Sequence, residues 1–283
     1  MTENRLQFDP VTQDDPNPSE KFSASMAPLF FESGGCKVYG TFFSAAGDGL
    51  HPTILLLVGF PGNEVNFDIA HMLRRKGYNV FTFYPRGCWG SEGNYSWQNL
   101  VDDGTAAINF LKTDSIKEKF KVDNKRISLV GHSMGGFSAL YNAIRFEEIK
   151  NICAISPFNA GMFGQALASN EQIKLYSIQQ MQPAMEFVKN DSAESLLNEM
   201  ITNQKEWNLL YHLEKLAKKN LLVVSAKFDS IAPVELHHAP LEANLKIINT
   251  NSEFTTLETG HSFSDKRIQL MKIISNWFTK IED

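Results

Sequence analysis

The sequence predicts an α/β fold, a mainly parallel sheet with helices on both faces and a helical cap inserted into it. Short apolar runs alternate along the chain with segments whose apolar residues recur at three- and four-residue steps. The alternation is interrupted over residues 158–220, which show helical patterns only and are too long for an ordinary connection. With 283 residues, 43% of them hydrophobic, the chain is also long enough to bury a substantial core.

An acidic, proline-bearing leader over residues 1–25 opens the chain, and we expect it to be mobile. Two antiparallel strands are predicted at residues 29–31 and 37–43. Apolar runs predict the strands of the parallel sheet at residues 53–58, 79–84, 126–130, 151–156, 221–226 and 245–250. Helical periodicity predicts helices at residues 67–77, 97–113, 135–146 and 264–281. The core domain would therefore comprise residues 26–157 and 221–283.

The cap, residues 158–220, would contain helices at residues 171–188 and 192–219. Pro183 lies inside the first of these, and because proline cannot donate an intrahelical hydrogen bond, it should kink or end that helix.

Composition excludes several classes of function. The net charge of −5 and the isoelectric point near 5.8 give no basic field for nucleic acid. The longest apolar run, residues 54–58, is far below the roughly 20 residues that cross a bilayer, and the first residues lack the pattern of a secretory signal. Cys36, Cys88 and Cys153 show no metal or disulfide spacing and suit a reducing compartment. We therefore expect a cytoplasmic protein.

Residues 131–135 read GHSMG, which matches the pattern G-x-S-x-G. The apolar run RISLV precedes it and the helical segment FSALYNAI follows it, so that the serine lies at a strand-to-helix turn. Glycines suit such a turn because the serine adopts a strained conformation and neighbouring elements approach closely. The turn would lift the Ser133 hydroxyl clear of the sheet, beside the positive end of a helix.

A serine becomes a good nucleophile only when a base removes its proton and a third group orients that base. Asp229 is expected in the loop after the strand at residues 221–226, and His261 in a loop after the final strand, where Gly260 would allow a tight approach. The chain order is then serine, aspartate, histidine. Glu258 and Asp265 lie close to His261 in sequence and remain alternative carboxylates.

From about Phe30 to its end, the chain resembles the α/β-hydrolase superfamily, and within it the soluble esterases and serine-peptidase-like hydrolases of the serine aminopeptidase type. The resemblance rests on PTILLL followed by GFPG, FYPRGCWGSEG, GHSMGG, the strand-end aspartate and the late GHSF. It implies that Ser133 is the nucleophile, that His261 is the general base and then the acid, and that Asp229 holds the imidazole. An acyl group would pass through Ser133 to water, and no cofactor is implied.

Two backbone N–H groups are candidates for stabilising the oxyanion of such a reaction. Met134 begins the helix after the nucleophile, so that its N–H has no partner in the helix. In the loop GFPG, Pro61 has no N–H, which leaves Phe60 as the donor, and the resemblance places the second donor at Phe60 too. Val58 stands where similar enzymes usually have a histidine.

Other polar residues favour structural interpretations. His237 and His238 are adjacent and lie near no HExxH or Cys/His cluster, so we expect no metal site. Asp102 and Asp103 are expected to complement a helix dipole. Arg86 fits a structural ion pair better than a contact with a substrate carboxylate.

Together the motifs predict a serine hydrolase that cleaves small to medium acyl or aryl carboxylic esters, with a small-molecule ester as its partner. A peptidase, amidase or thioesterase of the same fold and a non-catalytic ligand-binding protein are the alternatives. Met162, Phe163 and Met185 of the cap fit either an acyl pocket or the cap's own core. The oligomeric state is left open.

Overall fold

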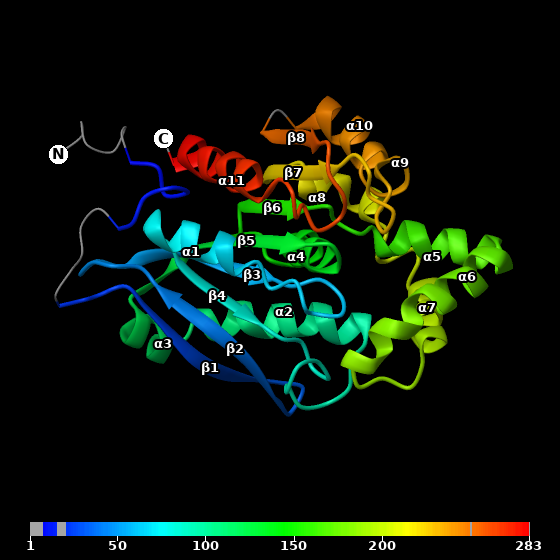
Figure 1. Cartoon of the computed structure of the whole chain (residues 1–283), viewed down its shortest axis with the longest axis horizontal. Helices are drawn as coiled ribbons and strands as arrows, with labels where there is room; N and C mark the ends of the chain where they lie inside the picture. Colours follow the sequence, from blue (N-terminus) through cyan, green and yellow to red (C-terminus); the bar gives the residue numbers. More distant parts are fainter. Residues whose placement is uncertain (1–7, 16–20, 250, 283) are drawn as a thin grey trace.

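Among the residues that the structure describes, eight strands form one sheet in the order β1-β2-β4-β3-β5-β6-β7-β8 (Figure 1). The computed structural model describes residues 8–15, 21–249 and 251–282. The strands are β1 (Ser25–Ser33), β2 (Cys36–Ser44), β3 (His51–Leu57), β4 (Asn79–Phe83), β5 (Val122–His132), β6 (Asn151–Ile155), β7 (Asn220–Ala226) and β8 (Ser252–Leu257). The pairs β1–β2 and β2–β4 are antiparallel, and all the other pairs are parallel. The predicted α/β fold is confirmed.

Helices cover both faces of this sheet. On β3, Leu55 and Leu57 belong to one apolar cluster, whereas Ile54 and Leu56 belong to the other. A strand buried on both faces needs apolar residues at every position, which explains the uninterrupted run that predicted it. The face of Leu56 is covered by α1 (Phe67–Arg75) and α11 (Arg267–Glu282). The opposite face is covered by α2 (Trp97–Leu111), α3 (Asp114–Phe120), α4 (Met134–Arg145), α8 (Leu213–Leu216) and α10 (Ala239–Ile248).

The predicted strand at residues 245–250 is wrong, because its described residues, 245–249, include the end of helix α10. Leu241 and Leu245, one helical turn apart, are the buried residues of this helix, whereas Ile247 is 82% exposed. The apolar residues of this run therefore belong to a helix with a buried and an exposed side, and do not form a buried strand. The last strand is β8, which lies at the edge of the sheet, and most of its residues are half-buried. Such an edge strand carries no long apolar run.

Residues between β6 and β7 form a helical insertion. Its elements are α5 (Ala160–Ser169), α6 (Glu171–Met181), the 3-10 helix η2 (Gln182–Phe187), α7 (Ala193–Thr202), the 3-10 helix η3 (Leu209–His212) and α8. Figure 1 shows α5, α6 and α7 together at the right, beyond the layered core. As Pro183 predicts, α6 ends at Met181, and the proline lies in the first turn of η2.

The insertion is fastened to the core through the N-terminus of α2. Glu199 on α7 accepts hydrogen bonds from the backbone N–H groups of Trp97, at 2.8 Å, and Gln98, at 2.9 Å. The indole N–H of Trp97 donates to the carbonyl of Leu196 at 2.9 Å. Burial raises the pKa of Glu199, while the two backbone N–H groups oppose that shift. A carboxylate from the insertion thus caps a core helix.

The described part of the segment expected to be a leader contacts α1. Asp15 forms an ion pair with Arg74 at 2.7 Å, and Arg75 donates from Nε to the carbonyl of Pro10 at 2.7 Å. Residues 1–7 and 16–20 of that segment lie outside the described residues.

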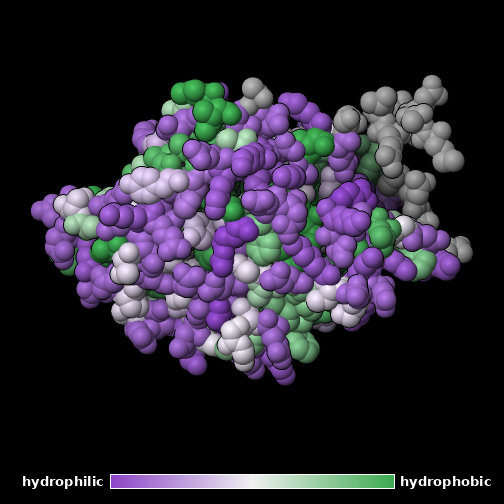
Figure 2. Space-filling model, turned by 180° about the vertical axis from the view of Figure 1, so that it is seen from behind, coloured by the Kyte–Doolittle hydropathy of each residue, from purple (hydrophilic) through white to green (hydrophobic). Residues whose placement is uncertain are grey.

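Seen from behind, the surface is largely hydrophilic, with small scattered groups of hydrophobic side chains (Figure 2). Within residues 8–15, 21–249 and 251–282, no helix combines the length and the apolar character needed to span a membrane.

Candidate active site

Ser133 lies between the end of β5 and the start of α4, as GHSMG predicts. Its φ of 57° and ψ of −122° place it in a strained, left-handed region. The flanking glycines are explained by close approach: a Cβ on Gly131 would overlap the carbonyl oxygen of Gly135, and a Cβ on Gly135 would overlap that of Leu57. The turn can therefore form only with hydrogen in place of a side chain at both positions.

Asp229 and His261 are in contact. His261 Nδ1 lies 2.7 Å from Asp229 Oδ2, and the other carboxylate oxygen of Asp229 accepts from the N–H groups of Ile231 and Ala232 at 2.9 and 2.8 Å. Burial alone would raise the pKa of Asp229, but the hydrogen bonds from His261, Ala232 and Ile231 outweigh burial and lower it to about 2. The carboxylate is thus charged at neutral pH and favours the imidazole tautomer with the proton on Nδ1. His261 Nε2 is then free to accept a proton.

The two alternative carboxylates are engaged elsewhere. Glu258 is exposed and pairs with Lys227 at 2.7 Å, and Asp265 accepts a hydrogen bond from the Thr259 hydroxyl. The interpretation of Gly260 as a point of tight approach is wrong, because a Cβ there would meet no atom within 4 Å.

His132 links the turn at Ser133 to the loop of His261. Its Nε2–H donates to the His261 carbonyl at 2.8 Å, and the two rings lie 4.8 Å apart. Burial, assisted by the proximity of His261, lowers the pKa of His132 to about 3, so that its imidazole is neutral. The position of His132 in the motif suggested packing or a contact with the loop of Phe60, and did not predict this hydrogen bond to the His261 carbonyl. In the part of the chain that the structure describes, Ser133 Oγ itself makes no hydrogen bond to His261.

The loop after β3 passes directly beside Ser133. A Cβ on Gly59 would lie 2.9 Å from the Cβ of Ser133 and 3.0 Å from the carbonyl oxygen of His132. Among the described residues, neither the Phe60 N–H nor the Met134 N–H donates a hydrogen bond, so both remain available to an oxyanion. The ring of Phe60 packs against Trp97, at 5.2 Å between centroids, and Val58 is buried.

A cavity of about 280 Å³ adjoins this loop. It is lined by Pro61, Asn63, Trp89, Pro183, Ala184 and Phe187, so that core loops and the insertion share it. Met162, Phe163 and Met185, for which the sequence left open an acyl pocket or the cap's own core, do not line this cavity. Phe163 packs edge-on against Phe158 at 5.1 Å, Met185 packs against the core cluster, and Met162 is half-buried on α5.

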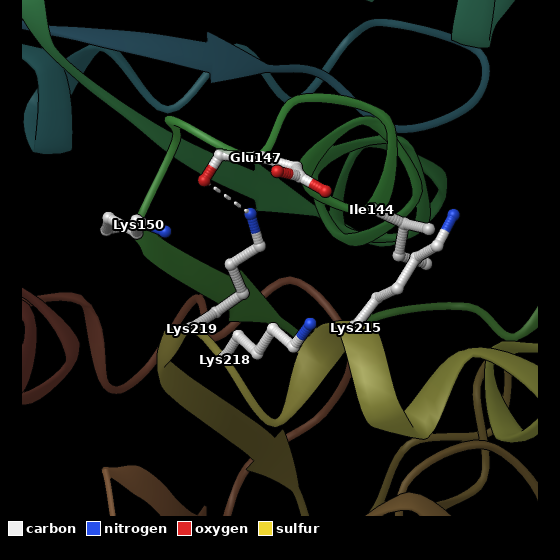
Figure 3. A pocket seen from close by; sticks show the side chains of 6 residues that line it. All are labelled: Ile144, Glu147, Lys150, Lys215, Lys218 and Lys219. Atoms are coloured by element: carbon white, nitrogen blue, oxygen red, sulfur yellow. Dashed lines mark hydrogen bonds between the residues drawn. The ribbon is translucent and has the colours of Figure 1, made fainter.

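A second, smaller cavity of about 70 Å³ is lined by Ile144, Glu147, Lys150, Lys215, Lys218 and Lys219 (Figure 3). Lys219 Nζ points toward the chain that follows α4 and donates to the carbonyls of Phe146, Glu147 and Ile149 at 2.9, 3.3 and 2.8 Å. Burial, and then Lys150, lower the pKa of Lys219 to about 8. All three ammonium protons are used within the protein, so Lys219 secures the end of α4 and has no free donor for a ligand.

His237 and His238 lie at the base of the insertion. His237 Nδ1 accepts from the Asn159 N–H at 2.9 Å, and His238 Nε2 donates to the Pro157 carbonyl at 2.9 Å. Across residues 8–15, 21–249 and 251–282, no three His, Cys, Asp or Glu side chains gather into a group that could hold a metal ion.

Solved structures with this fold include an esterase of Pyrococcus furiosus, which superposes with a TM-score of 0.64 at 19% identity over 95% of this chain and 99% of that one. An alpha/beta hydrolase of Penicillium has a TM-score of 0.65 at 18% identity and covers 89% of this chain and 98% of that one. An acylaminoacyl peptidase of Pyrococcus horikoshii has a TM-score of 0.64 at 16% identity and covers 90% of this chain and 41% of that one.

Curated relatives match over shorter stretches. An uncharacterized membrane protein of Saccharomyces cerevisiae is 36% identical over 101 residues, which are 34% of this chain and 33% of the relative. A thiohydrolase of Arthrinium phaeospermum is 29% identical over 129 residues, 44% of this chain and 40% of the relative. The chain thus spans half or less of the length of these relatives. The sequence profile of the alpha/beta hydrolase family matches residues 54–219, more than half of the chain. The turn at Ser133, the sheet order and this match agree, and the chain belongs to the alpha/beta hydrolase family.

Proposed function

We propose that the protein is a serine hydrolase that cleaves carboxylic esters, with Ser133, His261 and Asp229 as its catalytic triad. The observation that carries the proposal is the Asp229–His261 hydrogen bond of 2.7 Å, which joins a buried, charged carboxylate to an imidazole. His132, the residue next to Ser133, donates from Nε2 to the His261 carbonyl at 2.8 Å. The similarity of the fold to that of the Pyrococcus furiosus esterase supports the proposal.

In the proposed reaction, Ser133 Oγ attacks the ester carbonyl carbon as its proton moves to His261 Nε2. The negative charge that develops on the carbonyl oxygen is stabilised by the N–H groups of Phe60 and Met134. Asp229 stabilises the imidazolium. The C–O bond to the alcohol then breaks, and the alcohol leaves with the proton from His261.

Water completes the cycle. It attacks the acyl-serine as His261 removes its proton, and the acid leaves as Ser133 regains a proton. Helices α5 to α7 would act as the cap over this site, since η2 lines the cavity beside the loop of Phe60.

The test is covalent labelling with an active-site fluorophosphonate. We expect stoichiometric labelling of the wild-type protein, none of Ser133→Ala, and full labelling of the control Ser115→Ala, whose serine is exposed on α3. Failure of the folded wild-type protein to label would favour a non-catalytic binding protein and would contradict the proposal.

A substrate panel separates the reaction types. We expect p-nitrophenyl esters to be hydrolysed faster than aminoacyl anilides and acyl thioesters, with Ser133→Ala as the blank. Faster turnover of the anilides would establish a peptidase or amidase instead, and faster turnover of the thioesters would establish a thioesterase.

A further inference from the structure

Trp89 is a half-exposed aromatic residue that is held in one position beside the loop of Phe60. Its side chain is 45% exposed, yet its indole N–H donates to the Pro61 carbonyl at 2.7 Å. Its φ of 44° is a left-handed conformation that bulky residues rarely adopt. A Cβ on Gly62 would lie 2.9 Å from Trp89 Cδ1, so the indole lies directly on that glycine. Such strain persists only where the surroundings hold the residue in place, which is common at ligand sites.

The helical insertion supplies a matching aromatic wall. Phe187, in η2, is 49% exposed and stacks on Trp89 with 5.5 Å between ring centroids and 12° between ring planes. With Pro61, Pro183 and Ala184, the two rings form an apolar lining, and Asn63 is the polar residue among the six. Concave apolar surface left open to solvent is typical of a ligand site. Because none of the lining residues in the described part of the chain is charged, the cavity suits an uncharged apolar group.

The cavity lies beside the loop that contacts Ser133 of the proposed catalytic centre. Gly59 lies against Ser133, and Pro61, which lines the cavity, is two residues farther along the same loop. Since consecutive Cα atoms are at most about 3.8 Å apart, the Cα atom of Pro61 lies within about 8 Å of that of Gly59. A substrate whose carbonyl oxygen met the Phe60 N–H could therefore extend along Pro61 to Trp89.

We propose that this cavity binds an uncharged aromatic-ring-sized group of the ester substrate and that Trp89 determines this specificity. The volume of about 280 Å³ lies just below the range of pockets that hold a whole drug-sized ligand, which suits one such group. This inference rests on the proposed function, because it assigns the cavity to the same substrate.

The kinetic test uses the purified full chain and follows ester hydrolysis by pH-stat. Ethyl phenylacetate carries the ring on the acyl side, benzyl acetate carries it on the alcohol side, and ethyl acetate carries none. For the wild-type protein we expect kcat/KM to favour at least one ring-bearing ester over ethyl acetate. Trp89→Ala and Phe187→Ala should each reduce that preference about tenfold or more. Trp89→Phe should retain part of it.

Tyr176→Ala is the control, because Tyr176 is an exposed aromatic residue on α6 that does not line the cavity. If the preference for ethyl phenylacetate falls in the Trp89 and Phe187 variants, the acyl side of the ester occupies the cavity. If the preference for benzyl acetate falls, the alcohol side occupies it. The inference would be overturned if Trp89→Ala left the preference for both ring-bearing esters unchanged, or if Tyr176→Ala reduced that preference as much as Trp89→Ala does.

A binding measurement separates this inference from the proposed function. Calorimetry would compare Ser133→Ala with the double variant Ser133→Ala/Trp89→Ala, using the preferred ring-bearing ester as the titrant. We expect binding to weaken about tenfold or more in the double variant. If fluorophosphonate labels Ser133 but the loss of Trp89 leaves binding unchanged, the esterase proposal stands and the cavity proposal fails. If fluorophosphonate does not label the protein while binding depends on Trp89, the esterase proposal fails and the cavity proposal stands.

Discussion

Replacing Asp103 by asparagine should destabilise the protein strongly, whereas the same change at its neighbour Asp102 should not. The Asp103 carboxylate is 0% exposed and accepts from Arg86 Nε at 2.6 Å and from the Arg86 N–H at 2.7 Å. Asparagine preserves the size but leaves a buried guanidinium without a counter-charge. Removing one partner of a buried pair costs about 3–5 kcal/mol. Asp102 pairs with Arg145 at 3.4 Å with both side chains 40% exposed, and such pairs contribute about 0–1 kcal/mol.

The assay is urea unfolding of wild type, Asp103→Asn and Asp102→Asn, followed by circular dichroism. Burial raises the pKa of Asp103, while hydrogen bonds from Ser33 and Arg86 oppose that shift. The measurement is therefore made near pH 8, well above the usual range of a carboxyl pKa. We expect the unfolding free energies of the two variants to differ by about 2–5 kcal/mol at equal m-values. A loss in Asp103→Asn no greater than that in Asp102→Asn would refute the reasoning.

Three further outcomes are expected. Asp229→Asn should lower kcat about 10⁴-fold. The pKa of Asp229 is about 2 in the folded protein, below its value in the unfolded chain, so the carboxylate stabilises the folded wild-type protein at neutral pH. As the pH falls from about 4 to 2, the wild-type protein should lose this part of its unfolding free energy, and Asp229→Asn should show no such loss. Gly135→Ala should cost about 1–3 kcal/mol in urea unfolding because the new Cβ meets backbone, whereas Gly260→Ala, with open space, should change stability by less than about 0.5 kcal/mol. Lys219→Met should cost about 1–3 kcal/mol by leaving three carbonyls without their donor, and an equal loss in the exposed Lys218→Met would contradict that explanation.

Sequence alone predicted the features that depend on neighbours along the chain. The strands buried on both faces appear as continuous apolar runs, and GHSMG specifies a turn whose glycines meet nearby backbone. Strand β8 was misplaced because an edge strand needs no such run, while α10 carries apolar residues on its exposed side.

Pairings between distant segments could not be predicted in the same way. The Asp103 carboxylate appeared to serve its own helix end, yet its partner is Arg86 on the preceding loop. Trp89 and Phe187 are far apart in sequence, and a half-exposed aromatic has no pattern that distinguishes it from a surface residue.

The attachment of α7 to α2 bears on how the insertion can move. The Trp97 N–H donates to the Glu199 carboxylate, and the Trp97 ring packs against Phe60 with 5.2 Å between centroids. This fastening point of the insertion therefore lies next to the loop that contacts Ser133. A displacement of α7 would therefore act on Trp97, which packs directly against Phe60. The segment after η2 is a second fastening point, because the Lys189 N–H donates to the Gly87 carbonyl at 2.7 Å and the Tyr95 N–H donates to the Lys189 carbonyl at 2.7 Å.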